Sequence, residues 1–230
     1  MLDIVNAYLE ELFILLPRFS LLFIYALLFA LVEIEIEGKN GWAANLPTWF
    51  RRTPWYARIF AFVLSGKPLT GYHMVMFLIP FFSFHLGLAF GQSWSWGFEI
   101  RVVTTYLVWN ATWDFLWFLL NPHYGWSRFH KGMIWWHNGI WLGRLPIDYI
   151  VALGASVLLA AIPWLIFKNI SYILYQVSYI IFTVAAIILI GYFAPLYQRW
   201  YHYMRSAPKN EVPLRQESLA RGRKEVSKTR

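Results

Sequence analysis

The chain has 230 residues, of which 59% are hydrophobic, 20% aromatic and 14% charged, a composition that excludes an ordinary soluble domain. It contains no cysteine, which excludes disulfides, thiolate metal sites and a cysteine nucleophile, so that any metal would need nitrogen and oxygen ligands. The net charge of +8 lies beside apolar segments and in the C-terminal tail, which favours anionic lipid over nucleic acid as a partner.

Apolar segments long enough to cross a bilayer follow one another along the chain. Before the first span, residues 1–16 carry acidic residues where a secretory signal has basic ones, so we expect a short interfacial helix that ends at Pro17. We expect Pro80 to kink the second span, and Asn121-Pro122 to end the third. The sequence thus predicts an all-α integral membrane protein with five transmembrane helices, at residues 19–36, 70–90, 102–120, 147–167 and 177–196.

Two connecting segments are rich in aromatic and basic residues. Residues 37–69 have the pattern of an interfacial amphipathic helix. Residues 123–146 are expected either to lie in the headgroup layer or to fold back into the bundle. Residues 205–230 form a basic tail with few aromatics, which we expect to be disordered and to offer a docking site for a protein partner. The predicted organisation is one membrane-embedded helical domain, residues 1–204, followed by this tail.

The positive charges predict the orientation in the membrane. With five spans, 17 of the Lys and Arg residues fall on one side and only 3 on the other, namely Arg18, Arg101 and Lys168. Short loops rich in Lys and Arg remain in the cytoplasm. The sequence therefore predicts a multi-pass plasma membrane protein with its N-terminus outside and its C-terminus in the cytoplasm.

Ionisable side chains near the cytoplasmic ends of the spans are the functional candidates, because charges at membrane depth are costly. Glu33 and Glu37 are four residues apart and share a helix face. His73 opens the second span, Asp114 lies within the third, and His137 follows in the next loop. The five-span topology brings these groups to one layer, as an acid/base or metal site requires. Secondary candidates on the same side are His123, His130 and Asp148.

Two versions of the site follow from these residue types. In the first, a divalent metal (Fe, Mn, Zn or Mg) is ligated by carboxylates and imidazoles. In the second, Asp114 acts as general acid and His137 as base without a metal. The candidate ligands are Glu33, Glu37, His73, Asp114 and His137, and the candidate residues for binding an anionic headgroup are Arg51, Arg52, Arg58 and Lys67.

Several known chemistries are excluded by missing motifs. The six histidines do not have the spacing of the histidine boxes of membrane desaturases, and HExxH and GxSxG are absent. The leading hypothesis is a membrane-embedded enzyme acting on a lipid or isoprenoid substrate at the cytoplasmic leaflet. The alternatives are a non-catalytic membrane subunit or assembly factor, and a small transporter whose lumen follows the polar stripe of Asn110, Asp114 and Asn121.

Overall fold

The computed structural model describes residues 2–137 and 139–206, and the regular secondary structure of this part is helical apart from two short antiparallel β-ribbons. The predicted all-α class is therefore confirmed, whereas most of the predicted tail lies outside the described residues. The helices are α1 (Leu2–Glu37), α2 (Trp55–Val63), α3 (Gly71–Phe84), α4 (Leu86–Ala89), α5 (Trp96–Leu120), α6 (Gly125–Arg128), α7 (Ile147–Phe167) and α8 (Ser171–Arg205). The strands are β1 (Phe50–Arg51), β2 (Leu69–Thr70), β3 (Trp141–Leu142) and β4 (Leu145–Pro146), paired β1 with β2 and β3 with β4.

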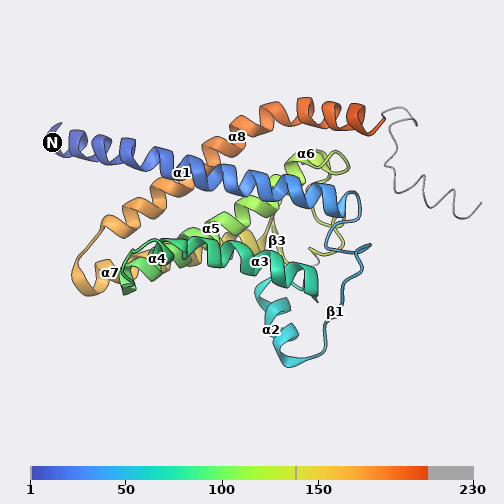
Figure 1. Ribbon diagram of the computed structural model, residues 1–230, viewed down its shortest axis with the longest axis horizontal. Coiled ribbons are helices and arrows are strands. Elements are labelled where there is room, and N and C mark those ends of the chain that lie inside the picture. Colours follow the sequence, from blue (N-terminus) through green and yellow to red (C-terminus); the bar gives the residue numbers. More distant parts are fainter. Residues whose placement is uncertain (1, 138, 207–230) are drawn as a thin grey trace, which may run out of the picture.

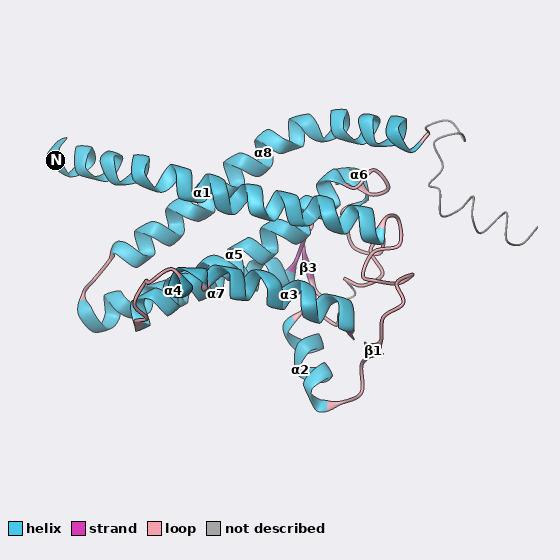
Figure 2. Cartoon of the chain, in the orientation of Figure 1, coloured by secondary structure: helices cyan, strands magenta, loops and turns pink. Residues whose placement is uncertain are grey.

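The long helices alternate in direction (Figure 1). Helices α1, α5 and α8 run one way, and α3 and α7 run the other, so that the N-terminus and the end of α8 lie at opposite ends of the molecule. The C-terminal ends of α1 and α5 therefore meet the N-terminal ends of α3 and α7. Figure 2 shows that the long irregular segments also gather at this end.

Three helical segments are long and apolar enough to cross a membrane: Phe13–Glu37, Ile147–Phe167 and Ser171–Arg205. Helix α3 is a shorter apolar helix. These findings support a multi-pass helical membrane protein. The count of five spans, the orientation and the plasma membrane remain predictions.

Two predicted boundaries are wrong. Pro17 does not end a separate interfacial helix, because proline removes a single backbone hydrogen bond while the adjoining turns of α1 continue. The second span does not run unbroken to residue 90. The ring of His85 lies 2.8 Å from the Phe81 carbonyl, and the backbone N–H of His85 donates to Phe82 instead, which ends α3 at Phe84.

The other boundaries agree better with the sequence. Helix α5 ends at Leu120, where Asn121 adopts extended geometry before Pro122 and donates to the Gly38 carbonyl. Helix α7 has the predicted bounds, and α8 is longer than the predicted span at both ends.

Helix α5 lies at the centre and packs against α1, α3, α7 and α8. Its side toward α1 carries the buried Trp109 and Trp113, while Ala26 and Ala30 of α1 are fully buried. Small side chains on one helix leave room for large rings on the other. The Trp109 indole donates to the carbonyl of Leu22, which satisfies its only polar group. This packing fixes the position of α1 relative to α5, and with it the ends that carry the candidate site.

The aromatic segments 37–69 and 123–146 behave differently. The second folds back onto the helices, with Phe129, Ile134, Trp136 and His137 buried, as one of the two predicted alternatives requires. Among the described residues of this segment only α6 is helical, so its three histidines do not share one helix face. The first contains α2, whose place at a membrane interface remains a prediction.

Candidate metal and acid–base site

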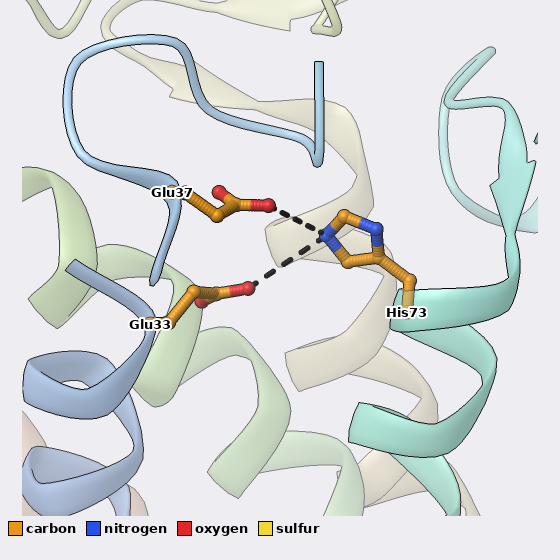
Figure 3. Close-up of side chains that lie close together, drawn as sticks. All are labelled: Glu33, Glu37 and His73. Atoms are coloured by element: carbon orange, nitrogen blue, oxygen red, sulfur yellow. Dashed lines mark ion pairs between the residues drawn. The ribbon is translucent and has the colours of Figure 1, made fainter. Parts of the chain in front are cut away.

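Glu33, Glu37 and His73 form a buried cluster at the meeting point of α1 and α3 (Figure 3). His73 Nε2 lies 3.7 Å from Glu33 Oε1 and 3.5 Å from Glu37 Oε1. One ligating atom from each side chain lies within 4.8 Å of the others. The exposed fractions of the three residues are only 5%, 7% and 2%. This geometry can hold a metal ion.

Local structure explains how these side chains converge. Glu33 and Glu37 are one helical turn apart at the C-terminal end of α1, so both point to the same side. Thr70 is the N-cap of α3, and its hydroxyl oxygen accepts the backbone N–H of His73 at 3.0 Å. The same oxygen lies 2.8 Å from His73 Nδ1. One threonine thus starts the helix and orients the imidazole, leaving Nε2 toward the glutamates.

A strained loop after α1 closes over the cluster. Trp42 and Ala43 have positive φ angles of 44° and 53°, which are uncommon for residues other than glycine. The Trp42 ring stacks on His73 with centroids 3.8 Å apart, and its indole N–H donates to the Pro68 carbonyl. The backbone N–H of Ala43 donates to Glu37 Oε1. Strain of this kind is retained where the surroundings hold it in place, often at functional sites.

A second group of ionisable side chains lies close to the cluster, around Asp114 of α5. Lys67 Nζ lies 3.4 Å from Asp114 Oδ2 and 3.2 Å from Asp148 Oδ2. His137 Nε2 lies 3.3 Å from Asp114 Oδ2, and its Nδ1 lies 3.7 Å from Asp148 Oδ2. The Tyr149 hydroxyl donates to Asp114 Oδ2 at 2.6 Å. An ammonium, an imidazole and a phenol therefore converge on Asp114.

Burial and neighbouring charges set the protonation states of Lys67 and His137, the two members of this group that lie in loops. Burial by itself would lower the pKa of Lys67, but the adjacent Asp114 and Asp148 outweigh it and raise the pKa above its ordinary value. Burial, with the Lys67 charge, lowers the pKa of His137. At neutral pH, Lys67 is therefore a fixed cation and His137 is neutral, so that one nitrogen of its ring can accept a proton.

The two groups share one cavity of about 70 Å³. Since about 10–15 Å³ of such space already holds a water molecule, it has room for an ion with bound water. Asp114 keeps 24% of its side-chain surface accessible, and it lines this cavity. The lining residues from the two groups include Glu33, His73, Lys67, Asp114, Asp148 and Tyr149.

The remaining predicted site residues lie elsewhere. His123 lines a separate hollow of about 410 Å³ with His202, and Glu37 lies at the boundary between that hollow and the cluster. His130 is outside the cavity, with Nδ1 3.1 Å from the Lys131 carbonyl. Arg51, Arg52 and Arg58 are exposed. Lys67 does not join these arginines on the surface, because it is buried between two carboxylates.

Sequence reasoning missed Tyr149, Thr70 and Trp42. Tyr149 follows Asp148 in the first turn of α7. The membrane side predicted for Asp148 therefore also placed a phenol on the side of Asp114. Thr70 stands three residues before His73 and has the spacing of a helix cap. No sequence signal indicates Trp42, whose position depends on the loop conformation.

Comparison of the chain with protein-family models, curated proteins and solved structures gave no match. The geometry of the site is therefore the basis for the function proposed below.

Proposed function

We propose that this protein is a membrane-embedded, metal-dependent enzyme that acts on a lipid or isoprenoid substrate, with the metal held by Glu33, Glu37 and His73. The observation that supports it best is the buried cluster itself, in which three ligating atoms from two helices lie within 4.8 Å of one another. A role in packing alone would not require two carboxylates to be buried together.

Charge balance supports a cation at this position. The cavity region contains four buried or partly buried carboxylates, whereas its one Lys side chain, Lys67, lies beside Asp114 and Asp148. Buried carboxylates are stable only when they are paired, protonated or coordinated to a metal. A divalent cation bound by Glu33 and Glu37 neutralises both of these charges.

The ligand set indicates the kind of metal. Two carboxylate oxygens and one imidazole nitrogen suit Fe, Mn or Zn, and Mg less well because it prefers oxygen ligands. Three protein ligands leave coordination positions open for water or substrate, as is typical of catalytic sites. In this position the metal would supply Lewis-acid activation of a bound oxygen.

The second group supplies proton transfer. Neutral His137 accepts a proton, and Asp114 fixes its orientation through Nε2. Tyr149 donates to the same carboxylate, and the Lys67 ammonium pairs with it. Asp114, which His137 contacts, lines a cavity that Glu33 and His73 line from the opposite side. We assign the exposed Arg51, Arg52 and Arg58 to contact with an anionic lipid headgroup.

The function is tested by comparing wild-type protein with Asp114→Asn, both loaded with metal in lipid nanodiscs made from the expression host's membrane. Mass spectrometry of the lipids should show a species that wild-type protein converts and the variant does not, with equal metal content in both. If wild-type protein neither binds metal nor changes any lipid, the polar cluster is a structural element of a non-catalytic subunit.

A further inference from the structure

An apolar cavity of about 240 Å³ lies between α5, α7 and α8, next to the candidate site. These three helices pack against one another in all pairs. The walls of this cavity are almost entirely apolar. The residues that form it include Val108 and Phe115 of α5, Leu153 of α7, and Val184, Ile187 and Ile188 of α8.

Two residues line both this apolar cavity and the polar one. Tyr149 and Ala111 are common to them, so the cavities adjoin at these side chains. The hydroxyl of Tyr149 is directed to Asp114, by its hydrogen bond of 2.6 Å. The polar and the apolar cavity therefore lie on either side of Tyr149 and Ala111.

The apolar cavity has few polar groups on its walls, chiefly the hydroxyls of Thr112, Thr183 and Tyr149. The Thr112 hydroxyl donates to the Val108 carbonyl of its own helix at 2.8 Å, so it is already satisfied. The cavity is open toward the surface, where Val184 and Ile188 are 49% and 57% exposed on an apolar helix. In a membrane, the surrounding hydrocarbon has direct access to it.

The width of the occupant distinguishes between two apolar candidates. A partner helix with its side chains is about 10–12 Å across, whereas α5, α7 and α8 already pack against one another in all pairs. A single extended hydrocarbon chain is much thinner than a helix and fits between helices that pack against each other.

Because the two cavities adjoin, we infer that the apolar cavity binds the hydrocarbon chain of the substrate and directs its polar end past Tyr149 and Ala111 to Asp114 and the glutamate–histidine cluster. The inference rests on the proposed function and specifies its substrate class, an amphiphile with one long acyl or isoprenyl chain beside its reactive polar end.

The test uses protein in phosphatidylcholine nanodiscs that contain a trace of palmitic acid bearing a diazirine in mid-chain. After illumination, mass spectrometry locates the labelled residues. Labelling should concentrate in the cavity residues at least fivefold over the exposed Leu189 region of α8. Val184→Trp and Ile188→Trp, which fill the cavity mouth, should reduce cavity labelling at least fivefold without changing metal content. Leu189→Trp on the same helix is the matched control and should leave labelling unchanged.

The inference is overturned if labelling is uniform over the apolar surface, if neither cavity-filling variant reduces it, or if the cavity residues cross-link to a second protein chain. Both variants change exposed positions, and metal content together with elution as a single species verifies that they fold. The result is independent of the proposed function, because a protein without metal can still be labelled in the cavity. Failure of metal binding and failure of chain binding are therefore distinguishable.

Discussion

The two sides of the polar cavity contain the same kinds of ligand but differ in their source of positive charge. Each side has two carboxylates and one imidazole: Glu33, Glu37 and His73 on one, and Asp114, Asp148 and His137 on the other. The second side also has the ammonium of Lys67 within 3.4 Å of both carboxylates. In the described part of the chain, the first side has no Lys or Arg within 4 Å, and its carboxylates contact His73 and, through Glu37, the backbone N–H of Ala43.

This difference indicates that the two sides have different roles. The Lys67 side chain cannot be exchanged with solvent, so the second side always keeps its own cation and can hold His137 and Tyr149 in fixed positions. The first side needs a cation from solution or must protonate, because burying unpaired carboxylates costs several kcal/mol each. We therefore expect one side to respond strongly to metal ions and the other to respond weakly.

Replacement of Lys67 should have the largest effect on stability. In Lys67→Met, Asp114 and Asp148 are left buried without their cation, which we expect to lower the free energy of unfolding by about 3–5 kcal/mol. The measurement is thermal unfolding in detergent. Because the second side would then resemble the first, added Mn²⁺ or Zn²⁺ should restore part of the lost stability. Lys39→Met changes an exposed lysine and should leave the melting temperature nearly unchanged. An unaltered melting temperature in Lys67→Met would contradict the assignment of Lys67 as the internal cation.

Removal of one charged ligand should abolish tight metal binding. Glu37→Gln keeps the size of the side chain and an oxygen that can accept from Ala43, but it loses the charge. We expect metal affinity to fall by more than about 100-fold, since even residues that only orient a ligand contribute 10–100-fold. Equilibrium dialysis followed by elemental analysis measures this. Glu35→Gln is the matched control on the same helix, because Glu35 is 57% exposed and pairs with Arg205. Equal losses in the two variants would argue for a nonspecific effect of charge.

Loss of the Thr70 hydroxyl should have a smaller effect on the same side. Thr70→Val removes both the α3 cap and the partner of His73 Nδ1. We expect about 1 kcal/mol of lost stability and a 10–100-fold weaker metal site. Thr70→Ser should restore both. Thr48→Val removes an acceptor for the Tyr72 N–H at the same helix start but leaves the contacts of His73 in place. It should therefore reduce stability without changing metal affinity. If Thr48→Val weakens metal binding as much as Thr70→Val, Thr70 does not act through the imidazole.

The titration of His137 should have the smallest effect on the free energy of unfolding. Because burial and Lys67 lower the pKa of His137, the unfolded chain takes up this proton more readily than the folded one. The contribution of neutral His137 is fully present above about pH 6.5 and declines as the pH falls below it. Unfolding measured between pH 8 and pH 5 should show a steeper decline for wild-type protein than for His137→Asn. Identical slopes would show that His137 does not resist protonation.

Periodicity and charge predicted much of the fold. The bounds of α7 and the end of α5 follow from apolar length and from the Asn121-Pro122 stop. Two features could not be predicted in this way: the continuity of α1 through Pro17 and the break at His85. Both depend on local hydrogen bonds that composition does not encode.

The candidate site was predictable to a similar degree. Helical spacing and the expected layer suggested Glu33, Glu37 and His73 together, and the structure brings them together. The burial of Lys67 was not predictable, because a lysine in an aromatic and basic segment has the pattern of a surface residue. Its partner Asp148 is 81 residues away along the chain, and the two meet because the loop between α2 and β2 folds onto the N-terminal end of α7.

The central claim is that the glutamate–histidine cluster of α1 and α3 binds a divalent metal. X-ray absorption spectroscopy of wild-type protein, purified without chelator and dialysed, tests it most directly. The predicted result is about one metal per chain, with a first shell of oxygen and a single imidazole, and loss of this signal in the Glu33→Gln/Glu37→Gln double variant. A wild-type protein that holds no more metal than the double variant would contradict the claim.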